Sequence, residues 1–241
     1  MERRDHHDWA SDAYVEEWVK RQQAADPERA QRFQLMCDLF PFPTDAPVTI
    51  LDVGAGYGPV SKFILDQCAK AICIAQDGSG PMLQRARQIM ASYGTRFQAH
   101  QSDLFDKNWL PQQFGPFDAA VSVSCLHNLR DFKRIREIYG EIYTLLKPGG
   151  AFLNADLINA PTAGLRQRYD GVTAARRRRE GAPAEDVAAL VRHGRRSPGT
   201  LTREPFPAAL DQHLAALKAV GFKDVDCFWK ELRRAVFGGY A

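Results

Sequence analysis

Hydrophobic and polar positions along the chain follow two alternating patterns. Short apolar runs predict strands, and longer segments with apolar residues three or four positions apart predict helices. The strands are expected at residues 48–53, 71–75, 96–101, 117–124, 151–155, 225–229 and 235–239. Helices are expected around 59–69, 80–92 and 132–147, with a shorter connection around 104–116. This alternation is typical of an α/β fold in which helices cover both faces of a mostly parallel sheet.

The two ends of the chain depart from this alternation. Residues 8–40 have helical spacing with a break at Asp26-Pro27, and a proline-rich linker follows. Residues 1–47 are therefore predicted to form a helical cap and linker. Only residues 230–234 separate the last two strands, which is too few for a crossover helix, so these strands are predicted to form an antiparallel hairpin.

A long segment, residues 160–206, interrupts the alternation after the fifth strand. It contains helical stretches at 173–180 and 184–193, and the next helix is expected to begin near Phe206. An insertion of this length at the carboxyl end of a strand is typical of a lid or substrate loop. We therefore expect one domain over residues 1–241 that carries a helical, lid-like insertion.

Charge is concentrated in that insertion. Between Ala160 and Phe206 the chain has ten arginines, no lysine and five acidic residues, a local net charge of +5. The other residues carry 22 basic and 24 acidic side chains, a net charge of −2, so the excess in the total of +3 comes from one segment.

Composition favours a cytoplasmic protein. The five cysteines are odd in number and show no CxxC spacing, which argues against a disulfide framework and against a zinc ribbon. No window approaches the roughly 18 consecutive apolar residues that a membrane span needs. The charged N-terminus lacks the apolar stretch of a secretory signal. We expect no metal site and no membrane partner.

The first predicted strand ends in a glycine-rich turn, DVGAGYG at residues 52–58. Glycines let the backbone turn sharply and approach a ligand closely, while the next helix offers free N–H groups. Dinucleotide-binding domains use a related turn, but Pro59 stands where their third glycine would fall. The turn alone leaves nicotinamide binding as an alternative, which Pro59 disfavours.

Acidic residues also close the next two strands, Asp77 in AQDGSGPML and Asp103 in QSDL. The order of these motifs, with FDAAVSVSCLHNL at 117–129 and LLKPGGAFL at 145–153, resembles the class I S-adenosylmethionine-dependent methyltransferases from about residue 30 to the end. The resemblance implies a Rossmann-like, seven-stranded, mostly parallel sheet in the order 3-2-1-4-5-7-6 with the last strand antiparallel.

The resemblance also implies how S-adenosylmethionine would be held. Asp77 would bind the ribose hydroxyls, Asp103 the adenine amine, and the turn at 54–58 would lie beside the methionyl portion. Carboxylates accept such hydrogen bonds well. Asp77 alone has a less favoured alternative as a helix N-cap, but acids ending successive strands meet at the edge where open α/β sheets bind ligands. The expected cofactor residues are Asp52, Gly54, Ala55, Gly56, Gly58, Asp77, Gly78, Met82, Ser102, Asp103, Leu104, Ser122 and Val123.

The acceptor site is less defined. His127 follows the fourth strand and is the candidate general base, since it can titrate near neutral pH. A histidine packed at a helix start is the alternative, given equal weight. Asp156 and Asn159, after the fifth strand, are further polar groups near the expected pocket, and His193 is a more remote one.

The four arginines at 176–179 are the densest charge feature. They would either contact phosphates of RNA or another anionic substrate, or form a solvated helix face. The second reading is favoured, because no RNA-binding module is recognisable and aromatic residues for base stacking are few. The NPPY-like motif of adenine or glutamine methylation and the Pro-Cys of cytosine-5 methylation are absent.

The sequence therefore predicts an S-adenosylmethionine-dependent methyltransferase that acts on oxygen or nitrogen of a small-molecule acceptor and has no nucleic-acid partner. One alternative is an RNA or protein methyltransferase that docks its substrate through the arginine-rich insertion. Another is a protein that binds S-adenosylmethionine without transferring its methyl group. The oligomeric state stays open.

Overall fold

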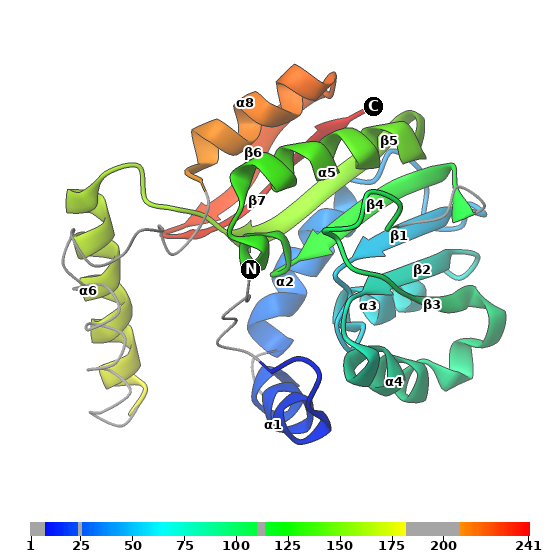
Figure 1. The fold of residues 1–241 in the computed structure, drawn as a ribbon, viewed down its shortest axis with the longest axis horizontal. Helices are drawn as coiled ribbons and strands as arrows, with labels where there is room; N and C mark the ends of the chain where they lie inside the picture. Colours follow the sequence, from blue (N-terminus) through cyan, green and yellow to red (C-terminus); the bar gives the residue numbers. More distant parts are fainter. Residues whose placement is uncertain (1–7, 24–25, 110–113, 182–207) are drawn as a thin grey trace.

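The computed structural model describes residues 8–23, 26–109, 114–181 and 208–241 (Figure 1). Within them the strands form one seven-stranded sheet in the order β3-β2-β1-β4-β5-β7-β6. The strands are β1 (Thr49–Val53), β2 (Ile72–Asp77), β3 (Phe97–Gln101), β4 (Phe117–Val123), β5 (Leu146–Leu157), β6 (Lys223–Glu231) and β7 (Arg234–Tyr240). Strands β1 to β5 pair in parallel, and β7 is antiparallel to both β5 and β6. The predicted order and the antiparallel last strand are confirmed.

Helices cover both faces of this sheet, as predicted. Helices α5 and α8 lie over one face, whereas α2 and α3 lie over the other (Figure 1). The helices are α1 (Asp12–Gln23), α2 (Asp26–Asp38), α3 (Pro59–Gln67), α4 (Gly80–Ile89), α5 (Phe132–Leu145), α6 (Ala163–Arg179) and α8 (Leu210–Val220), with 3-10 turns η1 (Ala91–Arg96) and η3 (Leu126–Leu129). No helix in the described part of the chain is long and apolar enough to cross a membrane.

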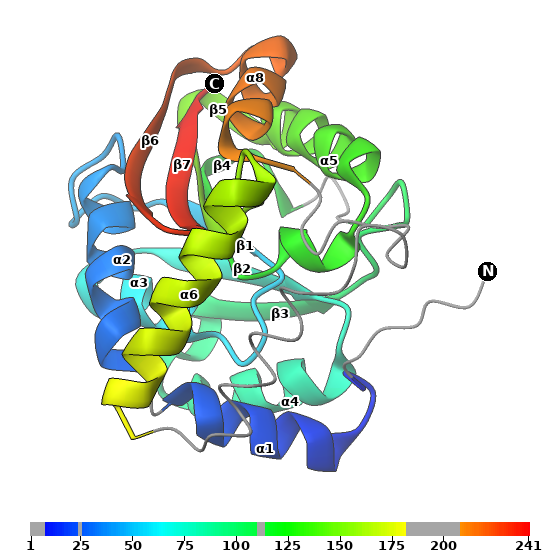
Figure 2. The same cartoon turned by 90° about the vertical axis from the view of Figure 1, so that its left-hand side faces the viewer.

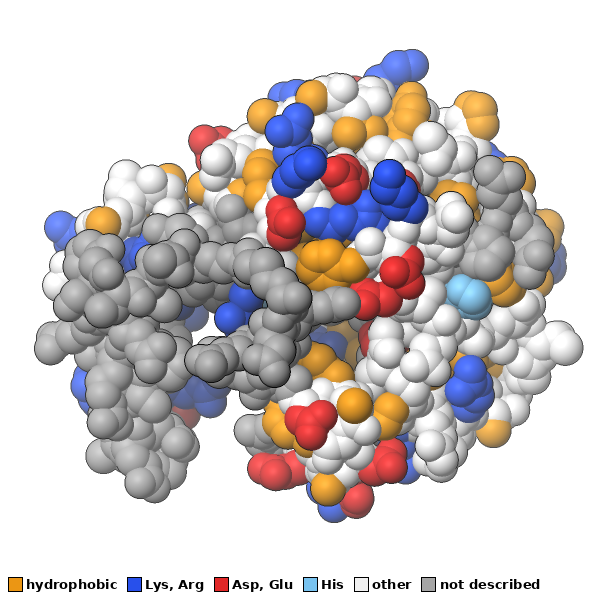
Figure 3. All heavy atoms as spheres, in the orientation of Figure 1, with side chains coloured by type: hydrophobic (Ala, Val, Ile, Leu, Met, Phe, Trp, Pro, Cys, Tyr) orange, Lys and Arg blue, Asp and Glu red, His pale blue; other side chains and the backbone are white. Residues whose placement is uncertain are grey.

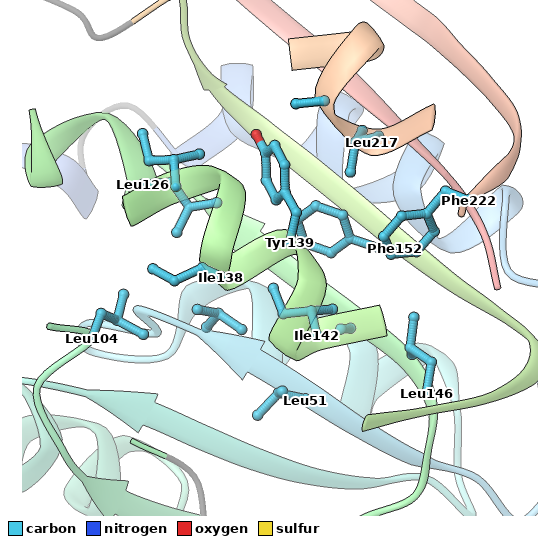
Figure 4. Packing of buried hydrophobic residues seen from close by; sticks show 14 of the residues in the cluster. Leu51, Leu104, Leu126, Ile138, Tyr139, Ile142, Leu146, Phe152, Leu217 and Phe222 are labelled. Carbon is cyan, nitrogen blue, oxygen red and sulfur yellow. The ribbon is translucent and has the colours of Figure 1, made fainter. Parts of the chain in front are cut away.

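Side chains alternate between the two faces along each inner strand. In β1, Leu51 belongs to the core beneath α5 and α8, whereas its neighbour Ile50 belongs to the core beneath α2 and α3. Figure 4 shows the first core, in which Tyr139 of α5 packs against Phe152 of β5 with ring centroids 5.5 Å apart and directs its hydroxyl towards α8. Packing of both cores stabilises the register of the strands, and the register determines where the strand ends lie.

Local sequence starts the helices at the carboxyl ends of the strands. Gly58 adopts a left-handed conformation (φ +82°) before α3, and Pro59, whose fixed φ suits a first helical position, begins the helix. The Ser79 side chain accepts a hydrogen bond from Met82 N at the start of α4. The Asp131 carboxylate likewise caps α5. The N-termini of these helices therefore gather at one edge of the sheet.

Several predicted boundaries were wrong. Strand β5 begins at Leu146 and not at residue 151, because Leu146 pairs with Phe117 across an irregular register. The helix expected near Phe206 begins at Leu210. Helix α4 ends at Ile89, and a 3-10 turn follows it. The expected helix at 184–193, His193 included, lies outside the described residues.

Two helices lie apart from the layers that cover the sheet. Helix α1 packs against α4, near the end of β2. Helix α6 follows β5 and stands away from the body of the molecule in Figure 1, and in Figure 2, seen from that side, it lies in front of the other elements. Within the predicted stretch at 173–180 the structure is helical to Arg179, but the helix begins ten residues earlier, where the Thr162 side chain caps it.

Candidate functional site

The glycine-rich turn lies where β1 ends, and two of its amides are held by β2. Gly54 N donates to Gln76 Oε1 (3.1 Å), and Gly56 N donates to Asp77 Oδ2 (2.8 Å). Gly54, Gly56 and Gly58 all have positive φ, which favours glycine. A Cβ at Gly54 would lie 1.9 Å from Cys125 Sγ, so this glycine is required by packing inside the protein. Among the described residues, a Cβ at Gly56 would meet only Met82 Sδ, at 4.0 Å, so there is space beside this part of the turn.

Asp77 lies at the end of β2 with its carboxyl turned towards the glycine-rich turn. Its Oδ1 accepts a hydrogen bond from Ser79 N (2.8 Å), and its Oδ2 accepts the one from Gly56 N. Burial raises the pKa of this carboxyl, while the backbone N–H donors act in the opposite direction. Each carboxylate oxygen can accept a second hydrogen bond, so Asp77 keeps the capacity to bind two hydroxyls of a diol.

Asp52 lies beneath the turn, packed against α3. Its Oδ2 accepts a hydrogen bond from Ser61 Oγ (2.6 Å), and the residue is 1% exposed. Its Oδ1 is buried and has no hydrogen-bond partner among the described residues. Burial raises the pKa of Asp52 to about 7, with a smaller contribution from the charge of Asp77. The first-strand acid therefore links the end of β1 to α3.

His127 and Asp156 form a hydrogen-bonded pair at the ends of β4 and β5. His127 Nδ1 lies 2.6 Å from Asp156 Oδ1, and His127 N donates to Asp156 Oδ2 (3.0 Å). Leu157 N also donates to Asp156 Oδ1 (2.8 Å). The two side chains are 15% and 4% exposed. Because an ionised carboxylate only accepts hydrogen bonds, the proton is assigned to Nδ1, which leaves Nε2 as an acceptor.

The neighbouring predicted residues are placed differently. Asp103 Oδ1 accepts a hydrogen bond from Phe105 N (2.9 Å) within its own turn. The Ser102 hydroxyl is buried and has no partner within the described residues. The backbone N of Asn159 donates to Ala208 O (2.7 Å), and Asn159 forms a bridge with Ala209 just before α8. The structure thus brings His127 together with Asp156 and directs Asn159 towards the start of α8.

The N-terminal cap contacts the glycine-rich turn through aromatic rings. The ring of Trp18 in α1 lies 5.3 Å from that of Trp9 and 6.1 Å from that of Tyr57 in the turn, as measured between centroids. Tyr57 OH accepts a hydrogen bond from Arg29 Nη1 of α2 (2.9 Å), and Ser79 Oγ donates to Trp9 O (2.5 Å). Both N-terminal helices are therefore attached to the loops at the carboxyl edge.

Comparison with known proteins matches this geometry. Residues 50–150 match a family described as a methyltransferase domain. Demethylmenaquinone methyltransferase of Thermus thermophilus is 30% identical over 105 residues, and malonyl-[acyl-carrier protein] O-methyltransferase of Salmonella typhimurium is 29% identical over 124 residues. These matches cover 44% and 52% of this chain, respectively, and 45% of each relative. The matched part of this chain therefore spans less than half the length of either relative. Human N-acetylserotonin methyltransferase, solved with S-adenosylmethionine, superposes with a TM-score of 0.62 at 17% identity, over 96% of this chain and 57% of the human chain.

The chain therefore matches a methyltransferase domain over residues 50–150 and shares the fold of solved methyltransferases.

At this edge of the sheet, the remaining predicted cofactor residues are backbone or packing groups. Ala55 N donates to Gln76 O (2.8 Å), and Ser122 Oγ donates to Val53 O (3.0 Å). A Cβ at Gly78 would make ordinary contact with Ser102 O at 3.7 Å. Met82 and Leu104 are buried, and Val123 is half-buried. The described residues contain no group of three or more histidine, cysteine, aspartate or glutamate side chains that could hold a metal ion.

Two polar residues that organise the candidate site were missed in the sequence. Gln76 spans the edge, since its Oε1 accepts from Gly54 N and its Nε2 donates to Ser102 O (2.7 Å). Arg134 of α5 holds the connection after β3 by donating from Nε to Leu104 O (2.6 Å), while its Nη1 donates to Glu141 Oε1 (2.6 Å) of its own helix. The signal for Gln76 was a polar residue inside the buried run ICIAQD; Arg134 had none, because its partners are 30 positions upstream and 7 positions downstream.

Proposed function

We propose that this chain transfers the methyl group of S-adenosylmethionine to an oxygen or nitrogen of a small-molecule acceptor. The observation that carries the proposal is the hydrogen-bonded pair of His127 and Asp156 at the same strand edge as the glycine-rich turn and Asp77. A donor site and a base at one edge are what a transfer between two bound molecules requires. The names of the relatives support a small acceptor, since they include a demethylmenaquinone methyltransferase and an N-acetylserotonin methyltransferase.

The residues at this edge fit the proposed cofactor. The open space at Gly56 accommodates the methionyl portion, and the remaining hydrogen-bonding capacity of Asp77 suits the ribose diol. The unpartnered hydroxyl of Ser102, next to Asp103, suits a polar edge of adenine. When bound, S-adenosylmethionine supplies an electrophilic methyl group on a sulfonium sulfur.

His127 would act on the acceptor. With its Nδ1 proton held by Asp156, its Nε2 accepts the proton that a hydroxyl or ammonium acceptor must lose. Asp156 stabilises the imidazolium that forms and keeps the ring in one orientation. A base of this kind favours an acceptor that carries a dissociable proton, and an oxygen acceptor has the greatest need of it.

The decisive experiment is formation of S-adenosylhomocysteine from S-adenosylmethionine and a panel of phenols, carboxylic acids and amines. We expect product with at least one acceptor, and a His127→Ala variant that binds S-adenosylhomocysteine normally but turns over roughly 10²–10⁴-fold more slowly. Turnover that is insensitive to His127→Ala would exclude this histidine as the base. Cofactor binding with no product from any acceptor would favour a protein that only senses S-adenosylmethionine.

The cofactor pose has its own test in calorimetry. Asp77→Ala should weaken S-adenosylhomocysteine binding roughly tenfold or more, because a buried hydrogen bond to a charged group contributes about 1.5–3 kcal/mol. Asp118→Ala is the control, since Asp118 lies at the opposite end of the sheet and holds Thr49 N (2.8 Å) and Lys147. Unchanged affinity in Asp77→Ala would show that the ribose lies elsewhere.

The proposal also covers the domain organisation and the location of the protein. Residues 1–241 would act as one domain in the cytoplasm, with 1–47 as a cap and 160–206 as a lid. The contacts of Trp9 and Tyr57 with the edge support the cap. The start of α6 directly after β5 supports a lid position for its described part.

A further inference from the structure

Helix α6 is attached to the molecule by its polar side chains and a narrow contact. Among its 17 residues only Ala174 is fully buried. Arg176 pairs with Glu231, and Asp170 pairs with Arg233 Nη2 (3.0 Å), both in the hairpin of β6 and β7. Lys230 lies over the ring of Tyr169, 5.2 Å from its centroid. These contacts use one side of α6 and leave the other side exposed.

The exposed side combines positive charge with an apolar stripe. Arg168, Val172, Ala175 and Arg179 lie four, three and four positions apart, so they share one face of the helix, and all four are exposed. Val172 is 40% exposed, which makes it one of two large hydrophobic side chains exposed in the described part of the chain. Arg177 and Arg178 extend the charge around the last turn.

This arrangement differs from the face of the molecule that Figure 3 shows. Acidic and basic side chains are interspersed on the face in Figure 3, whereas the last turn of α6 has four consecutive arginines. Arg176 is accounted for by its pair with Glu231, and the helix dipole favours one or two cations in a last turn, but three further consecutive arginines exceed that number. A short apolar stripe flanked by arginines complements a surface on which carboxylates flank an apolar ridge.

We propose that the exposed face of α6 docks an acidic, helical protein that carries the methyl acceptor as an attached small group. The identification of the attached group as the methyl acceptor rests on the proposed methyl transfer, whereas the docking of a protein on α6 does not. Because α6 begins directly after β5, which ends beside Asp156, a protein bound along α6 would hold its attached group near His127.

The observations favour a protein over RNA or a membrane. RNA presents phosphates and stacking bases, and the exposed stripe of α6 has no aromatic residue to receive a base. Val172 and Ala175 have no counterpart in a phosphate backbone. A membrane-binding helix would need a broader apolar face with large side chains, whereas this stripe has one valine and one alanine.

Fluorescence anisotropy with labelled probes tests the proposal. The probe is a helical peptide in which glutamates flank a stripe of leucines, and its control has glutamine in place of leucine. A single-stranded RNA of the same net charge and vesicles of phosphatidylcholine with phosphatidylserine test the other partners. The protein is the full chain, in parallel with R168Q/R177Q/R178Q/R179Q, with V172Q, and with the matched variant R85Q/R87Q/K133Q/R136Q, which removes four exposed bases from α4 and α5.

We expect the leucine peptide to bind best, with an affinity that falls as salt is added. The α6 quadruple variant should bind roughly tenfold to a hundredfold more weakly, and V172Q roughly threefold more weakly with the same salt dependence. The matched variant should bind normally. All variants should keep wild-type circular dichroism and wild-type affinity for S-adenosylhomocysteine, because they lie outside the cofactor site.

Several results would overturn the inference. They are tighter binding of RNA or vesicles than of the leucine peptide, equal losses in both quadruple variants, an unchanged affinity in V172Q, or no binding of any probe. Turnover of free small acceptors is measured on the same proteins. A lack of turnover in the wild type counts against the proposed function, while peptide binding still decides the docking.

Discussion

Replacing Asp52 with asparagine removes a carboxyl group whose pKa the fold raises from 3.8 to about 7. The main cause is burial beneath the glycine-rich turn, where water cannot solvate the negative charge, and the nearby charge of Asp77 adds to it. Asparagine has the same shape, and its carbonyl oxygen can still accept the hydrogen bond from Ser61 Oγ. The titration at this position is therefore the main property that the substitution removes.

The sign and size of the effect follow from linkage. The folded protein holds the Asp52 proton more tightly than the unfolded chain does, so protonation favours the folded state. This contribution is fully present below pH 3.8, declines as the pH rises, and is lost once the pH passes about 7. A separation of about three pKa units corresponds to about 4 kcal/mol in all, and about 2.5 kcal/mol of that disappears between about pH 5 and about pH 8.

Urea unfolding of the wild type and of Asp52→Asn, followed by circular dichroism at both pH values, measures this difference. The free energy of unfolding is obtained at each pH by linear extrapolation. The wild type should lose about 2.5 kcal/mol more than Asp52→Asn between the two conditions. Any pH-independent effect of the asparagine on the free energy of unfolding cancels, because only the change between the two pH values is compared. Asp45→Asn, at an exposed site in the linker before β1, is the control and should change with pH as the wild type does.

Equal pH dependence in the wild type and in Asp52→Asn would refute this reasoning. It would mean that the Asp52 carboxyl is already ionised in the folded protein at the lower pH. Burial of the Asp52 carboxyl would then not be the main influence on its pKa, and the carboxyl beneath the glycine-rich turn would be charged.

Three further predictions concern packing and orientation. Gly54→Ala should lower the free energy of unfolding, measured in urea, by about 3 kcal/mol or more, because φ is +67° and the new Cβ would lie 1.9 Å from Cys125 Sγ. Its control is Gly140→Ala in α5, where a Cβ meets nothing within 4 Å among the described residues, and this variant should raise the free energy of unfolding by about 0.5–1 kcal/mol. Equal effects of the two substitutions would contradict the placement of Cys125. Tyr139→Phe removes the hydroxyl 2.8 Å from His213 Nδ1 and should cost about 1–3 kcal/mol in the same assay with S-adenosylhomocysteine binding unchanged; a neutral effect would show that His213 has another partner. Asp156→Asn should lower the kcat of S-adenosylhomocysteine formation roughly 10²–10⁴-fold, while the affinity for the cofactor changes less than about twofold. An unchanged kcat would show that His127 does not depend on Asp156 for its orientation.

The placement of the residues proposed to hold S-adenosylmethionine could be predicted because their signals are local. The apolar run before Asp52 predicts a buried strand, and the glycines after it predict a tight turn. Asp77 ends the next strand in the same way. Parallel strands in one sheet end at one edge, so knowing the strands was enough to bring these residues together. The geometry of Gly56 and Asp77 agrees with this expectation.

The roles of other residues in the site could not be predicted in this way. The local pattern gives no reason for Gly54 to differ from Gly56, yet Cys125 requires the first and leaves the second open. Asp52 and Asp77 are both acids at strand ends, yet one packs beneath α3 against Ser61 and the other binds the turn. These differences depend on which helix covers each side chain.

What the amino-acid sequence determined about this protein is therefore the set of elements, their order and the residues at the strand ends, because periodicity, glycine and proline act within a few residues. The tertiary structure alone decided that His127 meets Asp156, 29 positions away, and that α6 turns its stripe of Arg168, Val172, Ala175 and Arg179 outwards. Contacts between remote positions depend on how the helices pack on the sheet. That packing is a property of the whole chain, and it converts a common strand edge into one particular site.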